Sequence, residues 1–158
     1  MAFAEDLLKQ AFLLARKEPK NPSEASLRRS VSTAYYALFH LLVRDASANW
    51  RRSDTRDYLA RAFDHATMKK ASTRIENADY TGIDPALASK LKSVGRAFRE
   101  LQEQRHLADY SYATKWDRVG VLSKIEQARS AFVAWESIRK EYLAQRYLVA
   151  LLVSYKED

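Results

Sequence analysis

The residues best suited to chemistry lie close together around position 105. Arg105 and His106 are adjacent, and Asp109, Tyr110 and Tyr112 follow shortly after them. Arginine binds phosphate through paired N–H donors, and histidine exchanges protons near neutral pH. Such side chains could hold an anionic ligand and move protons to and from it.

Arg105 occupies an unusual position on the helix that the sequence predicts around it. Apolar residues recur every three or four positions ahead of it, at Leu87, Leu91, Val94, Phe98 and Leu101. This is the period of one buried helical face, and its next position is residue 105. A guanidinium stays charged, and burying one without a partner is costly. We therefore expect Arg105 to face a ligand or a second protomer, unless it pairs with Asp109 on the next turn and is purely structural.

The rest of the chain predicts an all-α fold that would position these side chains. Glycine and proline number only three each in 158 residues, and helix-favouring residues are abundant. Apolar periodicity and cap signals predict a bundle of four long helices plus a short one, in a single domain over residues 1–158. The long helices are expected at residues 4–17, 23–49, 85–108 and from Thr114 or Asp117 to at least Tyr142, either extending or kinking into 148–155, and the short one at 57–72.

Composition excludes several classes of function. The chain has no cysteine, which excludes disulfides, iron–sulfur clusters and thiol catalysis and fits a reducing cytoplasm. There is no glycine-rich phosphate loop and no metal-ligand spacing. His40 and His65 stand alone, and we expect His40 to be structural and His65 to be structural or exposed. We therefore expect neither a cofactor nor a metal. The first ten residues do not resemble a signal peptide, so we expect a cytoplasmic protein.

The longest apolar run is Leu148–Val153, which is far too short to span a membrane. No membrane partner is therefore expected. The wider segment 148–155 is still more apolar than a terminal turn needs. We expect it to pack over the bundle or against a partner subunit.

The charge balance points to a polyanionic partner. The formal net charge is +7, which favours nucleic acid, although a basic surface can also serve solubility alone. The densest basic region spans residues 51–74 and is interrupted by aspartates. Within it, Arg51, Arg52, Lys69 and Lys70 are the candidate RNA-binding residues.

Three segments of the chain resemble the HEPN superfamily, and in particular its HepT-like branch. Residues 27–40, LRRSVSTAYYALFH, are similar to the second helix of that branch. Residues 61–65, RAFDH, are similar to its AFxH segment, and residues 105–110, RHLADY, to its R-x-x-A-D-Y ending. The resemblance covers roughly residues 5–140.

The resemblance implies a helical bundle that forms a symmetric homodimer. It also implies a metal-independent endoribonuclease, often the toxin of a pair whose antitoxin is a small nucleotidyltransferase. The family motif is an arginine followed after four to six residues by a histidine. Some HepT members extend the motif with a tyrosine two positions later, which the antitoxin modifies.

This motif fits the sequence in two registers. Counted from Arg105, the histidine position holds Tyr110 and the modified tyrosine is Tyr112. Counted from Arg99, His106 falls within the motif's range. The first register matches the HepT-like branch better, whereas the second preserves the histidine. The candidate catalytic residues are therefore Arg105, His106, Arg99 and Tyr110.

Three functions remain open from the sequence. The first is a HEPN ribonuclease in which a two-fold dimer brings Arg105 and His106 of both protomers into one cleft. The second is a catalytically degenerate HEPN module that binds RNA or a protein partner, with Tyr110 marking the lost histidine. The third is a helical structural subunit whose basic charge is incidental. We favour the first, because His106 supplies a titratable group directly beside Arg105.

Overall fold

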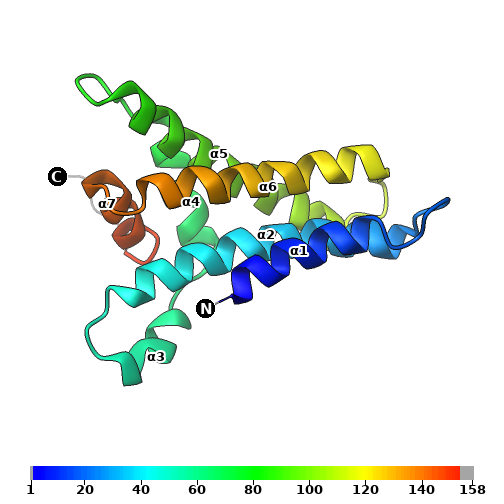
Figure 1. The fold of residues 1–158 in the computed structure, drawn as a ribbon, viewed down its shortest axis with the longest axis horizontal. Helices are drawn as coiled ribbons and strands as arrows, with labels where there is room; N and C mark the ends of the chain where they lie inside the picture. The colour runs from blue at the N-terminus through cyan, green and yellow to red at the C-terminus, as the bar shows by residue number, and fades with distance from the viewer. Residues whose placement is uncertain (1, 154–158) are drawn as a thin grey trace.

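The computed structural model describes residues 2–153, which form seven α-helices and one short 3₁₀ helix, with no β-strand in that range. The predicted all-α class is therefore confirmed. The elements in chain order are α1 (Phe3–Ala15), α2 (Glu24–Ala48), η1 (Ser53–Thr55), α3 (Arg56–Ala60), α4 (His65–Asn77), α5 (Pro85–Tyr110), α6 (Arg118–Ile138) and α7 (Tyr142–Ala150) (Figure 1).

Helix α2 lies at the centre of the fold. It packs against α1, α5 and α6, and its far end also contacts α3 and α7. Figure 1 shows α1, α2 and α6 running nearly alongside one another, with α5 at an angle to them. The side chains between these helices are fully buried, among them Leu38, Phe98, Ile125 and Trp135. No helix among residues 2–153 is long and apolar enough to cross a membrane.

The predicted helix starts are confirmed by their caps. The side chain of Ser23 accepts a hydrogen bond from the Ser26 N–H at 3.1 Å, which begins α2. Asp84 accepts from the Leu87 N–H ahead of the first proline of α5. Of the two candidates for the start of α6, Asp117 is the cap. Each side-chain oxygen satisfies a backbone donor that the first helical turn leaves without a partner.

The predicted single short helix over 57–72 is wrong, because the chain forms two helices there. Asp64 takes an extended conformation and accepts hydrogen bonds from the Thr67 N–H at 2.8 Å and the Thr67 hydroxyl at 2.9 Å. Helix α3 has already ended at Ala60, and the Asp64 cap starts α4 at His65. Helix α4 then continues to Asn77, five residues beyond the predicted end, and packs against α5.

The predicted last helix also divides, into α6 and α7. The chain turns after Ile138, and α7 packs back across α2 and α4. The Tyr147 hydroxyl lies 2.7 Å from the Ser72 hydroxyl of α4, and Leu148 and Leu151 are buried. The described part of the apolar segment 148–155 therefore packs on its own bundle. Residues 154 and 155 of that segment lie outside the described range.

Gly95 lets α4 and α5 approach closely. A Cβ atom at this position would lie 2.5 Å from the backbone oxygen of Ser72 and 2.6 Å from Cγ1 of Ile75, both on α4. Any side chain here would push the two helices apart. This close packing of successive helices places the first turn of α4, with His65, beside the second half of α5.

Candidate functional site

Arg105 continues the buried face of α5, as the sequence predicts. Leu91, Val94, Phe98 and Leu101 are buried, and the next side chain on the stripe is Arg105, with an exposed fraction of 12%. Its guanidinium carbon lies 5.5 Å from the ring centre of Tyr35 and 5.9 Å from that of Tyr36, on α2. Such cation–π contacts stabilise a partly desolvated arginine.

The polar contacts of Arg105 leave most of its donors unused. Nη1 lies 3.4 Å from Oδ2 of Asp109, a long contact for a charge-assisted pair. The other carboxylate oxygen, Oδ1, accepts a hydrogen bond of 2.5 Å from the Ser32 hydroxyl. The Nε atom of Arg105 is buried and has no hydrogen-bond partner among the described residues. The Asp109 pairing that the structural alternative requires is thus present, but it satisfies few of the five guanidinium donors.

His65 belongs to the same cluster, although the sequence treats it as an isolated residue. Its Nδ1 atom lies 2.6 Å from the Tyr35 hydroxyl, and its ring lies 5.0 Å from that of Phe39. Partial burial, reinforced by the positive charge of Arg105, lowers the pKa of His65, while Asp64 opposes the shift. Helices α2, α4 and α5 therefore place an arginine, a histidine and a buried tyrosine together.

The hydrogen bond between Tyr35 and His65 assigns the histidine proton. The Tyr35 side chain is fully buried, and burial raises the pKa of its hydroxyl, so that hydroxyl stays protonated and needs an acceptor. Nδ1 of His65 is the acceptor that it contacts. Neutral His65 therefore carries its proton on Nε2 and presents an N–H donor. In this state it can bind an anion, but it is not a base.

Acidification is expected to destabilise this arrangement. Partial burial lowers the pKa of both His65 and His40 below 6.5. A histidine with a depressed folded pKa binds its proton more weakly in the native state than in the unfolded chain. The free energy of unfolding should therefore fall as the pH is lowered from about 7 through the folded pKa values.

Urea unfolding at several pH values between about 7.5 and 5 measures this dependence. A variant with both His40→Gln and His65→Gln should show a shallower fall than the natural chain. Equal pH dependence in the two proteins would contradict the assignment of neutral, buried histidines.

His106 and Tyr110 lie on the exposed surface of α5. Their rings are 5.0 Å apart, and both side chains are exposed to solvent. Adjacent helical residues point about 100° apart, so His106 projects in a different direction from Arg105. Within one protomer, the two residues therefore do not line one cleft, and a common site would need a second protomer.

Arg99 is held by the acids of α4 and α5. Its Nε and Nη2 atoms lie 2.6 and 2.9 Å from the two carboxylate oxygens of Glu76, and Nη1 lies 3.5 Å from Glu103. The hydrogen bonds that Arg99 donates to the Glu76 carboxylate raise the pKa of Arg99. The register that begins at Arg99 would thus use an arginine that already stabilises the contact between these helices.

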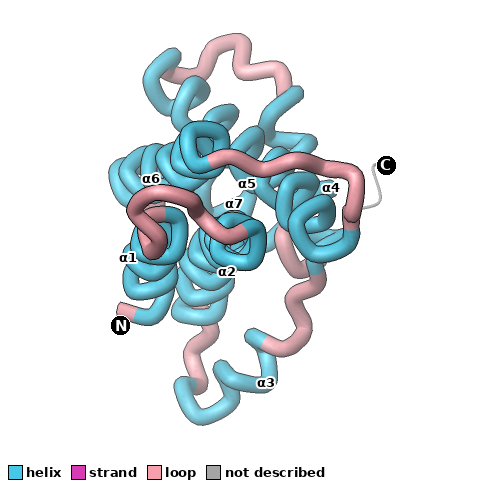
Figure 2. Tube along the Cα trace, turned by 90° about the vertical axis from the view of Figure 1, so that its right-hand side faces the viewer, coloured by secondary structure: helices cyan, strands magenta, loops and turns pink. Residues whose placement is uncertain are grey.

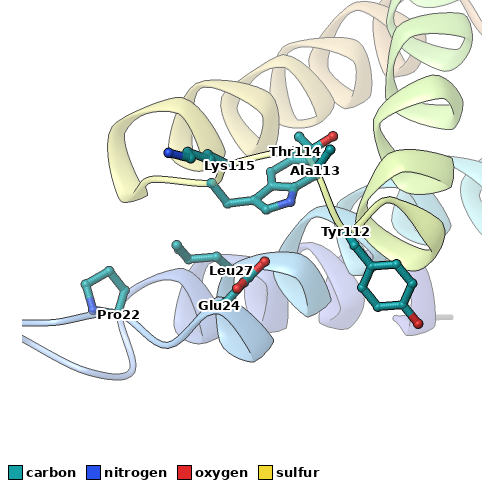
Figure 3. A pocket seen from close by; sticks show the side chains of 8 residues that line it. Pro22, Glu24, Leu27, Tyr112, Ala113, Thr114 and Lys115 are labelled. Atoms are coloured by element: carbon teal, nitrogen blue, oxygen red, sulfur yellow. The ribbon is translucent and has the colours of Figure 1, made fainter.

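Tyr112 projects from the loop that follows α5 and is fully exposed. It lies at the rim of a hollow of about 400 Å³ between this loop and the start of α2. Figure 3 shows its ring directed away from the other labelled residues, including Pro22, Leu27 and Lys115. A tyrosine in this position is accessible to a modifying enzyme.

The four predicted RNA-binding residues lie on two separate elements. Arg51 and Arg52 follow α2, and Lys69 and Lys70 lie on α4. Arg52 pairs with Asp54 at 2.7 Å, and Lys69 lies 3.5 Å from Glu103, whereas Arg51 and Lys70 are exposed. Whether they contact RNA stays a prediction.

Comparison with protein-family models, curated proteins and solved structures finds no match to this chain. The described residues, 2–153, contain no group of three or more histidine, cysteine, aspartate or glutamate side chains that could hold a metal ion. The function must therefore be argued from the side chains themselves.

Proposed function

We propose that this chain is a HEPN-type endoribonuclease that cleaves RNA without a metal and acts as the toxin of a toxin–antitoxin pair. The observation that supports this most is the state of Arg105. It is a nearly buried cation, stacked on two tyrosines, with a buried N–H that lacks a partner. An arginine with spare donors at the edge of a core is suited to grip a phosphate oxygen.

In the proposed reaction, a base removes the proton of a ribose 2′-hydroxyl, and O2′ forms a bond to phosphorus. The bond from phosphorus to O5′ breaks, and an acid gives O5′ a proton. The products are a 2′,3′-cyclic phosphate and a 5′-hydroxyl. Arg105 stabilises the negative charge of the phosphorane, and the N–H donor of His65 adds a neutral contact to the same anion.

His106 is proposed as the proton-transfer group, with Tyr110 as a hydrogen-bond donor. Both side chains are accessible on α5, and one histidine cannot serve both proton transfers in one step. A symmetric homodimer would supply His106 twice and set it across from Arg105 of the other protomer. The site is therefore proposed to be complete only in the dimer.

A second function is favoured by one observation. His65 presents a donor rather than a base, and His106 projects from α5 in a different direction from Arg105, so a single protomer can hold a phosphate but has no base beside it. A degenerate HEPN module that binds RNA or a protein partner without cleaving it would have this arrangement. Such a protein should retain RNA at low salt and release it as salt is added, leaving it intact.

The two functions are separated by incubating purified protein with single-stranded RNA in EDTA. The ribonuclease proposal expects cleavage by the natural chain, and a loss of about 10²-fold or more in His106→Ala, because general acid–base catalysis contributes at least this much. Lys115→Ala, which removes an exposed residue from the loop after α5, is the matched control. Intact RNA, or equal cleavage by all three proteins, would contradict the proposal.

The exposed Tyr112 supports the proposed partner of the toxin. A nucleotidyltransferase antitoxin needs a tyrosine hydroxyl that it can reach, and Tyr112 is fully exposed two residues after the end of α5. Co-expression with a nucleotidyltransferase encoded next to this gene should add a nucleotide to the natural chain and none to Tyr112→Phe. Mass spectrometry of the purified protein measures that addition.

A further inference from the structure

A short projection from the bundle is unlike the rest of the surface. Residues 49–61, here called the α3 arm, comprise the loop after α2, η1 and α3. Figures 1 and 2 show this arm extending away from the other helices. Helix α2 packs against α3, and the last residues of α3, Leu59 and Ala60, are partly buried against the core.

Two aromatic rings are exposed on the α3 arm. The exposed fractions of Trp50 and Tyr58 are 50% and 74%. The Trp50 indole N–H donates a hydrogen bond of 2.8 Å to the Thr55 hydroxyl, which fixes the orientation of the ring. Because these two rings bury little of their surface against the bundle, packing of the core does not account for their presence. They offer flat apolar faces to a ligand.

The α3 arm is rich in arginine. The arm carries four arginines against two aspartates, Asp54 and Asp57. The guanidinium of Arg61 lies 5.7 Å from the centre of the Tyr58 ring, and both Arg61 and Arg51 are exposed without an acidic partner among the described residues. A surface that alternates aromatic rings and free cations matches the bases and phosphates of a nucleic acid.

A third arginine organises the arm. Nε of Arg56 donates a hydrogen bond of 2.9 Å to the backbone oxygen of Trp50, and Nη2 donates one of 3.2 Å to that of Ala48. These bonds tie the start of α3 to the end of α2, so both aromatic rings belong to one folded unit. The arm is therefore already ordered before a ligand binds, which lowers the entropic cost of binding.

We propose that the α3 arm binds single-stranded RNA. Bases stack on Trp50 and Tyr58, and Arg51 and Arg61 contact the flanking phosphates. A single strand is the favoured form, because the bases of a duplex already stack on one another and cannot reach an exposed ring. The proposal rests on RNA being the substrate of this protein. It adds a second surface, separate from the Arg105 cluster, that binds the RNA strand.

The test uses a labelled 2′-O-methyl oligonucleotide, which lacks the nucleophilic hydroxyl and so stays intact with the natural chain. Fluorescence anisotropy should show binding of the single strand and much weaker binding of the matching duplex. Each of Trp50→Leu and Tyr58→Leu should weaken the affinity by about fivefold or more, because stacking on one ring contributes at least this much per base. Circular dichroism melting of each variant checks that the bundle is intact.

The matched control is Tyr142→Leu on α7. Tyr142 has the same exposed fraction as Tyr58, 74%, and a guanidinium, that of Arg146, 6.0 Å from its ring centre. It lies outside the α3 arm, so its replacement should leave the affinity unchanged. In the natural chain, stacked bases should also quench the fluorescence of Trp50. The change in signal can be assigned to Trp50, because Trp135 is fully buried and Trp116 is partly buried.

The outcomes separate this inference from the proposed ribonuclease. Loss of affinity in the two arm variants, without cleavage of natural RNA by any protein, would support the arm and overturn the ribonuclease. Unchanged affinity in both variants would overturn the arm, whether or not RNA is cleaved. Stronger binding of the duplex, or no binding of either form by the natural chain, would also overturn it.

Discussion

Replacing Arg105 by alanine is expected to lower the rate of RNA cleavage by about 10²- to 10³-fold, the usual cost of removing one preorganised donor from a transition state. The side chain is held by the rings of Tyr35 and Tyr36 and by Asp109, so its position is fixed before substrate arrives. Arg105→Lys keeps the charge but loses the planar fork, and it should recover only part of the rate. Single-turnover cleavage in EDTA measures both variants.

The role of Arg105 can also be measured without an activity assay, through the pKa of His65. The charge of Arg105 lowers the pKa of His65, so the pKa of His65 should rise in Arg105→Ala and stay nearly unchanged in Arg105→Lys. NMR titration of the imidazole resonances measures this shift. A second outcome is that Arg105→Ala shows the expected rise in the pKa of His65 and still cleaves RNA at the normal rate. That result would contradict a role for Arg105 in catalysis, although it would support the contact between Arg105 and His65.

Replacing Trp135 by alanine is expected to cost about 3–5 kcal/mol of the free energy of unfolding, the usual range for a large aromatic side chain in a core. Trp135 is fully buried on α6 and also donates a hydrogen bond of 2.7 Å to Asp45 of α2. Arg139 binds the same carboxylate, at 2.7 Å. The substitution therefore leaves a cavity and removes one donor from a half-buried acid.

Two further variants interpret the result for Trp135. Trp135→Phe keeps much of the volume and should cost less than the alanine variant. Val133→Ala changes an exposed residue on the same helix and should cost less than about 0.5 kcal/mol. Urea unfolding measures all three. A cost for Trp135→Ala as small as that for Val133→Ala would show that the contact between α2 and α6 is packed differently.

The regular helices could be predicted because their signals are local. The caps Ser23 and Asp84 and the apolar stripe of α5 depend on residues within a few positions of one another, and each was found as expected. The two divided segments could not be predicted in this way. The cap at Asp64 competes with a continuous apolar pattern, and the turn before α7 depends on long-range packing against Ser72.

In the candidate site, the sequence predicts the position of Arg105 but not the contact between His65 and Tyr35. Arg105 was found because a charged residue interrupts an apolar period, which is visible in one segment. His65 contacts Tyr35 across 30 positions of the chain, and no periodicity reports such a contact. The one available signal was the resemblance of residues 61–65 to the AFxH segment. That resemblance did not reveal that His65 would lie beside Arg105.

The most direct measurement of the proposed chemistry is the identity of the RNA ends. The natural chain, incubated in EDTA with a single-stranded RNA of known sequence, should produce fragments with 2′,3′-cyclic phosphate and 5′-hydroxyl ends, detected by mass spectrometry. Arg105→Ala, purified in parallel, should form the same fragments about 10²- to 10³-fold more slowly. Intact RNA with the natural chain, or the same fragments at equal rates from both proteins, would contradict a metal-independent ribonuclease centred on Arg105.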